Sequence, residues 1–258
     1  MTDIFTSSKT LVIYETEKIT GTHCNEHDVH NRHSLLKGFN QRALEKTRIN
    51  LIGAGGLGSE TGIALVRKGI GELNIYDSDR VDITNLSRQH YFRKDLYKPK
   101  AGQLSENLSQ MATGKSIIRG VSLMIQEAVD QKKCFDSDIV IVGVDNSETR
   151  FYCSEKFKDK PVIFTAVNPE ADSGYVFVQE KGGACFGCLF GDQNGRPARK
   201  CAGATIDINK VMGGIVSYAV DTLIMRRQRD WNFKQVHFHG PFIDFNKKIL
   251  KEPECRFC

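Results

Sequence analysis

The glycine-rich stretch at residues 51–60, Leu-Ile-Gly-Ala-Gly-Gly-Leu-Gly-Ser-Glu, most constrains how this chain can fold. An apolar run precedes it and a segment with helical periodicity follows it, which predicts a strand that turns into a helix. Glycine allows a sharp turn and a close backbone approach to a phosphate, whose charge the helix N-terminus favours. Four glycines are candidate nucleotide contacts: Gly53, Gly55, Gly56 and Gly58. Because nicotinamide dinucleotide-binding proteins share the Gly-x-Gly-x-x-Gly spacing, the stretch alone leaves the nucleotide open.

Strand and helix patterns alternate through the first two thirds of the chain. The strands are expected at 48–52, 72–76, 116–121, 138–144 and 161–167, and the helices at 57–68, 99–111, 125–134 and 147–157. The run at 138–144 is continuously apolar, as strands buried on both faces of a parallel sheet are. This alternation predicts an α/β fold with a Rossmann-like, doubly wound sheet.

The pattern changes after residue 174. Strands with alternating character are expected at 175–179 and 235–239, and one long helix within 207–229. We expect antiparallel strands here that extend the parallel half of the same sheet. A polar, irregular N-terminal arm (1–45) is expected to precede one domain (46–258). The closely spaced histidines of this arm are expected to be solvated or at an interface. A Gly/Pro/basic loop at 191–204 is expected to cross over within that domain.

Charge and hydropathy exclude several classes of partner. The formal net charge of +5 over 258 residues is mild and scattered, so nucleic-acid binding is not expected. No apolar run approaches the roughly 20 residues that cross a bilayer, so no membrane association is expected. The N-terminus lacks the basic-then-apolar layout of a secretory signal. A cytoplasmic location is therefore the expectation.

Polar side chains gather after the second expected strand. Asp77 follows Gly58 by 19 residues and is placed to accept hydrogen bonds from ribose hydroxyls. The chain then supplies more donors than a nicotinamide cofactor needs: Asn85, Arg88, Gln89 and Lys100. Cleaving a triphosphate between its α- and β-phosphates builds charge on the pyrophosphate, which arginine and lysine stabilise. The cluster therefore favours ATP.

Asp145 directly follows the buried run at 138–144. That position lies at the carboxyl edge of the expected sheet, where open α/β sheets bind their ligands. Magnesium usually takes one or two carboxylates together with phosphate oxygens. We therefore expect Asp145 to bind Mg²⁺ beside the triphosphate.

Four of the eight cysteines form two Cys-x-x-Cys pairs, Cys185 with Cys188 and Cys255 with Cys258. In a cytosolic enzyme such pairs favour a metal over disulfides, and four thiolates can close a tetrahedral zinc site. The zinc would attach the end of the chain to its body. The alternatives are a redox pair, for which no thioredoxin-like βαβ context surrounds either motif, or a fortuitous spacing.

Several of these segments resemble the ThiF/MoeB/HesA family, which shares its adenylation domain with ubiquitin-activating enzymes. They are residues 53–59 (Gly-Ala-Gly-Gly-Leu-Gly-Ser), 77–89 (Asp-Ser-Asp-Arg-Val-Asp-Ile-Thr-Asn-Leu-Ser-Arg-Gln), 98–101 (Lys-Pro-Lys-Ala) and 144–150 (Val-Asp-Asn-Ser-Glu-Thr-Arg). Residues 31–39 (Asn-Arg-His-Ser-Leu-Leu-Lys-Gly-Phe) are similar to the family's N-terminal segment. The likeness runs from about residue 31 to the C-terminus, with the motifs in family order.

The resemblance implies ATP- and Mg²⁺-dependent adenylation of a carboxylate, usually the C-terminal glycine of a small ubiquitin-like protein. It assigns the ribose to Asp77, the phosphates to the four donors above, and Mg²⁺ to Asp145. Asp79 matches the family's second acidic position. Arg32 matches an arginine that completes the site of the other protomer, which implies a homodimer. Zinc is common in the family at the two cysteine pairs.

Cys201 follows Arg199 and Lys200, and neighbouring cations lower the pKa of a thiol and activate it. In sulfur-transferring relatives, a cysteine of this loop takes the acyl group or forms a persulfide. The Gly-Val-Leu-Gly-Pro-like run that usually follows is absent here, and simple members adenylate without such a cysteine. Cys201 is therefore only a candidate nucleophile.

Other functions remain compatible with parts of the pattern. Some relatives activate a ribosomal peptide or a tRNA-borne carboxylate, and the sequence does not name the acceptor. A non-catalytic subunit of an activating heterodimer has no need to retain Arg88, Lys100 and Asp145 together. A nicotinamide-dependent oxidoreductase fits the glycine motif alone, but the second half contains no residues for hydride-transfer chemistry.

Overall fold

The computed structural model describes residues 28–191, 203, 205–239 and 244–258. They form one sheet in the strand order β3-β2-β1-β4-β5-β6-β7-β8. The parallel strands are β1 (Arg48–Ile52), β2 (Glu72–Tyr76), β3 (Ile117–Val121), β4 (Ile139–Val142) and β5 (Val162–Val167). The antiparallel strands are β6 (Ser173–Gln179), β7 (Phe233–His237) and β8 (Asp244–Lys247). The predicted parallel half with an antiparallel extension is thus confirmed.

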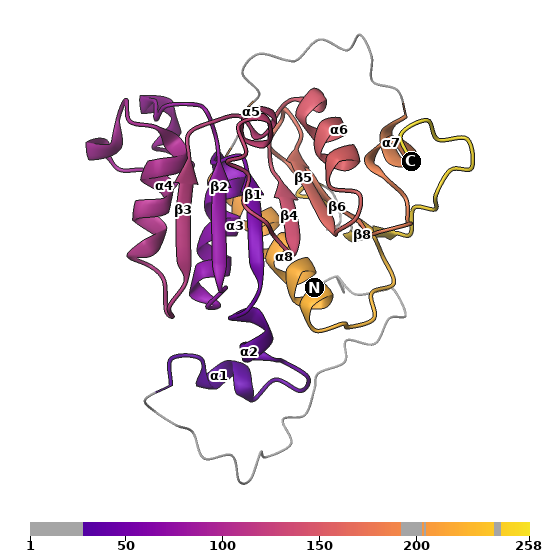
Figure 1. Cartoon of the computed structure of the whole chain (residues 1–258), viewed down its shortest axis with the longest axis horizontal. Helices are drawn as coiled ribbons and strands as arrows, with labels where there is room; N and C mark the ends of the chain where they lie inside the picture. The colour runs from indigo at the N-terminus through magenta and orange to yellow at the C-terminus, as the bar shows by residue number, and fades with distance from the viewer. Residues whose placement is uncertain (1–27, 192–202, 204, 240–243) are drawn as a thin grey trace, which may run out of the picture.

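Helices cover both faces of this sheet (Figure 1). One face carries α3 (Gly56–Arg67), α4 (Lys100–Ser109) and α8 (Ile206–Ile224), and the other carries α5 (Ile125–Asp130), α6 (Ser147–Lys156) and α7 (Phe186–Phe190). Successive side chains of a strand point to opposite faces of the sheet, so Leu51 packs with the first set of helices and Ile52 with the second. This alternation buries both faces of the central strands and produces three layers.

The chain reverses its direction of travel across the sheet at β1. From β1 it moves outward to β2 and β3, and then returns to add β4 on the other side of β1. A crevice opens at the carboxyl ends of the strands where the order reverses, and open α/β sheets bind ligands there. The glycine turn and the segments after β2 and β4 all leave the sheet at this edge.

Two four-residue helices precede the sheet, α1 (Asn31–Ser34) and α2 (Gln41–Leu44). Figure 1 draws them at the end of β1 opposite the glycine turn. The expectation of an irregular arm was wrong for these residues, because four-residue helices are too short to show periodicity. His30 is also buried rather than solvated, and its Nε2 lies 2.8 Å from Thr113 Oγ1.

The predicted boundaries agree with the long elements and miss the short ones. The helix expected at 125–134 ends at Asp130, and β8 and α7 were not predicted. Two 3₁₀ turns, η1 (Ile83–Asn85) and η2 (Arg93–Asp95), lie in the segment between β2 and α4. Among the residues that the structure describes, no helix combines the length and apolar character of a membrane span.

Candidate nucleotide cleft and cysteine cluster

The glycine turn is built so that β1 and the start of α3 come very close together. Gly53 adopts a φ of 100°, a left-handed conformation that side chains disfavour. A Cβ on Gly58 would lie 2.0 Å from the carbonyl oxygen of Gly53, so no other residue fits there. Gly55, by contrast, has nothing within 4 Å of its Cβ position. The turn therefore packs tightly on its inner side and leaves its outer side open to a ligand.

The Asp77 side chain is fixed at the end of β2. Its two carboxylate oxygens accept hydrogen bonds from the backbone N–H groups of Ala54, at 2.7 Å, and Asp79, at 2.8 Å. Burial raises the pKa of Asp77 above its ordinary value, although these two hydrogen bonds and the charge of Lys100 oppose the shift. The carboxylate is thereby held in one orientation against the glycine turn.

Lys100 begins α4 and reaches back to the segment after β2. Its Nζ lies 2.8 Å from a carboxylate oxygen of Asp79, and its backbone N–H donates to the carbonyl oxygen of Asp79. The Lys100 side chain is 11% exposed, while that of Asp79 is 67% exposed. A largely buried ammonium group is thus paired with a carboxylate that faces solvent.

The turn η1 and the residues directly after it contain three more of the predicted residues. The Asp82 side chain accepts a hydrogen bond from the backbone of Thr84, and Asn85 Oδ1 accepts one from the backbone of Asp82. This reciprocal pattern is a capping box, which fixes the turn. The backbone N–H groups of Arg88 and Gln89 both donate to the carbonyl oxygen of Asn85. All three side chains line the same cleft.

Asp145 lies on the loop between β4 and α6. The next residue, Asn146, caps α6 by accepting a hydrogen bond from the backbone of Thr149 at 2.8 Å. Because the cap fixes the loop, the Asp145 carboxylate stays at the sheet edge, where it is exposed. An exposed carboxylate at this edge is available to a metal ion that also binds phosphate oxygens.

A single cleft of about 730 Å³ gathers nearly all of these groups. It is lined by Gly53, Gly55, Gly56, Asp77, Asp79, Asn85, Arg88, Gln89, Lys100 and Asp145. Gly58 is not part of the lining, because it supports the turn from within. Arg32 lies on α1, exposed and outside this cleft.

The cleft also contains residues that the sequence analysis missed. Gln126, Arg150 and Asn209 belong to its lining. Arg150 closes the resembling segment 144–150 and donates to the carbonyl oxygen of Val144. Asn209 comes from α8, more than a hundred residues after the glycine turn, and no local pattern marks it. Only the packing of α8 against α3 reveals that it belongs to the site.

The two Cys-x-x-Cys pairs meet as the spacing predicted. The four sulfur atoms lie within 4.8 Å of one another, with Cys185–Cys188, Cys185–Cys255 and Cys188–Cys258 separations of 3.8, 3.6 and 3.5 Å. Zinc–sulfur bonds of about 2.3 Å in a tetrahedron place the sulfurs about 3.8 Å apart. These separations fit a shared zinc ion and are too long for disulfide bonds.

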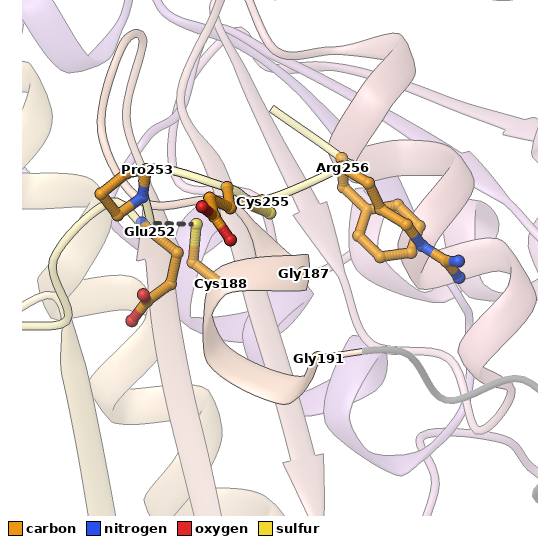
Figure 2. Close-up of a pocket in the computed structure, with 9 residues that line it drawn as sticks. Gly187, Cys188, Gly191, Glu252, Pro253, Cys255 and Arg256 are labelled. Carbon is orange, nitrogen blue, oxygen red and sulfur yellow. Dashed lines mark hydrogen bonds between the residues drawn. The ribbon is translucent and has the colours of Figure 1, made fainter.

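The surroundings of Cys188 favour its thiolate, which is the form that binds a metal. Figure 2 shows the Cys188 side chain at α7 beside Cys255 of the C-terminal segment, with the backbone N–H of Glu252 donating to its sulfur. Burial opposes the thiolate of Cys188, but hydrogen bonds from the Glu252 and Cys185 backbones and from neighbouring thiols lower its pKa to about 7. Among the described residues, this is the only group of three or more histidine, cysteine or acidic side chains whose ligand atoms lie close enough together to share a metal ion.

Some sequence predictions lie outside the described residues. They include Cys201, nearly all of the loop 191–204, and residues 1–27 of the arm. The candidate nucleophile therefore stays a prediction.

Curated proteins of similar sequence include several adenylyltransferases. The molybdopterin-synthase adenylyltransferase of Escherichia coli (strain K12) is 25% identical over 241 residues, which cover 89% of this chain and 95% of that protein. The sulfur carrier protein ThiS adenylyltransferase of Bacillus subtilis (strain 168) is 29% identical over 70% of this chain and 52% of its own length. The NEDD8-activating enzyme E1 catalytic subunit of Arabidopsis thaliana is 34% identical over 45% of this chain, which spans only 25% of it.

Solved structures share the architecture. E. coli MccB in complex with N-formylated MccA aligns with a TM-score of 0.72 at 20% identity, over 84% of this chain and 69% of that one. E. coli MccB with ATP aligns with a TM-score of 0.68 at 20% identity, over 84% and 68%. At this identity the likeness shows a common fold.

The doubly wound sheet and the polar cleft at its reversal point are typical of nucleotide-binding proteins of the α/β class. A model of the ThiF family matches residues 30–257, and the chain belongs to that family. Within the family, it is an enzyme of the adenylyltransferase type.

Proposed function

We propose that this enzyme transfers AMP from ATP to the C-terminal carboxylate of a small ubiquitin-like protein or a peptide, releasing pyrophosphate. The observation that carries the proposal is that Arg88, Lys100 and Asp145 line one cleft around the glycine turn. A dinucleotide cofactor has no use for this density of charge, whereas a triphosphate and its leaving pyrophosphate do. The sulfur-carrier adenylyltransferases among the relatives support a protein acceptor.

In the proposed reaction, a carboxylate oxygen of the acceptor attacks the α-phosphorus of ATP. The new O–P bond replaces the bond between the α-phosphorus and the bridging oxygen, and pyrophosphate leaves with that electron pair. The acceptor is already ionised at neutral pH, so the site needs no general base. Catalysis then consists of alignment and charge neutralisation, which fits a cleft furnished with amides and cations.

Each cleft residue has a role consistent with its contacts. Asp77, oriented by Ala54, accepts the ribose hydroxyls. The donors Asn85, Arg88, Gln89 and Lys100 bind phosphate oxygens. The ion pair with Asp79 keeps the Lys100 ammonium beside the cleft, and the higher charge of a triphosphate competes for it. Asp145 would hold Mg²⁺, which when bound neutralises phosphate charge.

Arg32 has no role in the cleft of its own chain, because α1 lies at the opposite end of β1. We therefore propose that the enzyme is a homodimer in which Arg32 enters the cleft of the partner. The cysteine cluster is proposed to hold one structural zinc, which ties the C-terminal segment to α7. Phe257 already packs there against Phe151, with ring centroids 4.7 Å apart.

Exchange of labelled pyrophosphate into ATP tests the proposal. The exchange should require an acceptor, for which we choose a ubiquitin-fold carrier ending in Gly-Gly from the same genome. Asp145→Ala should lower the exchange rate about a hundredfold or more. Glu148→Ala, an exposed acidic residue on the same loop-to-helix segment but outside the cleft, should leave it nearly unchanged. Exchange by Asp145→Ala at the parent's rate would contradict the assignment.

A further inference from the structure

Asn209 is a buried amide with an unused donor. It lies in the first turn of α8 and is 2% exposed. Its Nδ2 has no hydrogen-bond partner among the residues that the structure describes. A buried N–H group left unpaired costs free energy comparable to a lost hydrogen bond, so such groups usually have a partner when the protein functions. Asn209 therefore needs a partner that the residues described in the structure do not supply.

The position of Asn209 indicates what this partner is. The amide lies directly against the glycine turn, because a Cβ built on Gly56 would be 2.3 Å from Nδ2. Gly56 is the first residue of α3, whose first-turn N–H groups have no acceptors within the helix. Both residues line the cleft. Two helix N-termini and one free amide donor thus converge on the same part of it, which favours an anionic oxygen.

The two ends of the cleft are also distinguishable. Asp77, the proposed ribose acceptor, lies at the end of β2, on one side of β1. Helix α8 packs against α3, β5 and β6, on the other side. A nucleotide whose ribose lay at Asp77 and whose phosphates crossed the glycine turn would bring a phosphate oxygen to Asn209. In that arrangement the ribose and base would lie on the far side of Gly56 from this amide.

We propose that Asn209 is a phosphate-positioning residue whose Nδ2 donates a hydrogen bond to a phosphate oxygen of the bound nucleoside triphosphate. The inference rests on the proposed function, since it assumes that ATP occupies the cleft. It adds a donor from α8 to those that η1 and α4 provide. A side chain at Gly56 would displace this amide, because its Cβ would lie 2.3 Å from Nδ2.

Calorimetric titration of the whole protein with ATP·Mg²⁺ and, separately, with adenosine tests this proposal. Asn209→Asp keeps the shape of the side chain and replaces the donor with a negative charge, while Asn209→Ala only removes the donor. For both variants the affinity for ATP should fall about tenfold or more, and that for adenosine should stay within about twofold. Ser217→Ala is the matched control, because Ser217 is equally buried on α8 and its hydroxyl is also unpaired, but it lies outside the cleft.

Two results would overturn the proposal. One is ATP binding by Asn209→Ala with the parent's affinity, and the other is an equal loss of ATP and adenosine binding. Melting temperatures, measured alongside, show whether each variant is folded, and Asn209→Ala decides if Asn209→Asp is not. Failure of the parent protein to bind ATP at all would instead refute the proposed function. If the parent protein binds ATP but exchanges no pyrophosphate, the proposed adenylation is refuted. The role of Asn209 in phosphate binding can still be tested in that case, because its test measures only binding.

Discussion

The carboxylate of Asp77 accepts a hydrogen bond from the backbone N–H of Ala54, at 2.7 Å from Oδ2. This bond joins the end of β2 to the glycine turn after β1, so the proposed ribose acceptor is fixed directly to the turn proposed to bind the phosphates. Asp77→Ala removes the acceptor of Ala54 together with that of the ribose. We expect adenosine affinity to fall about tenfold and unfolding to become easier by about 1–3 kcal/mol. Calorimetry and denaturant unfolding measure the two effects, and unchanged adenosine affinity would exclude Asp77 from ribose binding.

The binding of adenosine should also depend on pH. Because burial raises the pKa of Asp77, its carboxylate takes up a proton at a higher pH than an ordinary aspartate. The protonated group is a weaker acceptor, so affinity should fall as the pH drops through this raised pKa. Titrations between about pH 7 and pH 4 measure this change. In Asp77→Asn this titration is lost, and the same acid limb in that variant would assign it to another group.

Gly58 and Gly55 offer a matched pair within the glycine turn. A Cβ at Gly58 would collide with the carbonyl oxygen of Gly53. Because both the added group and the atoms it meets are attached to or part of the backbone, neither can move aside easily. Gly58→Ala should therefore destabilise the protein by about 3 kcal/mol or more. Gly55→Ala meets nothing within 4 Å and should keep its stability, while the added methyl group obstructs the phosphates. Thermal unfolding and ATP titration distinguish the two, and equal stability of both variants would contradict the described geometry.

The cysteine cluster predicts about one zinc ion per chain, measured by elemental analysis. Cys185→Ser should lose the metal and lower the melting temperature, because the C-terminal segment is then no longer tied to α7. Cys134→Ser is the control, since Cys134 is a free cysteine outside the cluster. Full stability of metal-free protein would show that the sulfurs meet without a structural metal.

The proposed role of Arg32 in a partner's cleft can be tested by complementation. Arg32→Ala and Asp145→Ala should each be inactive alone. Mixed dimers contain one cleft with both residues intact, so equal co-expression should restore about a quarter of the parent's activity. The measurement is pyrophosphate exchange by the co-purified mixture. Activity in Arg32→Ala alone would remove this residue from the reaction.

Local sequence patterns predicted the elements with long apolar runs, and missed those defined by tertiary contacts. The run Ile139–Val142 is buried throughout, and its hydrophobicity marks β4 directly. The edge strand β8 has only four residues, Asp-Phe-Asn-Lys. Residues 245–247 of this strand are exposed to solvent. Its pairing with β7 is what makes it a strand.

The candidate site shows the same division. The predicted residues from 53 to 145 lie in the segments that follow β1, β2 and β4 or at the start of α3 and α4, so the topology places these segments at one edge. Asn209 lies inside a helix, and nothing in its neighbourhood in the sequence distinguishes it from a core residue. Its relation to Gly56 depends on how α8 crosses α3. The spacing within each cysteine pair predicted a metal site. That the two pairs, 70 residues apart, meet in space is a property of the fold.

The most direct test of the central claim is mass spectrometry of a Gly-Gly-ending ubiquitin-fold carrier after incubation with the enzyme and ATP·Mg²⁺. The account predicts that the carrier gains the mass of one AMP residue on its C-terminal carboxylate. The gain should be absent with Lys100→Ala and with a carrier whose C-terminus is amidated. A nicotinamide cofactor bound in the cleft, or AMP attached equally to the amidated carrier, would contradict it.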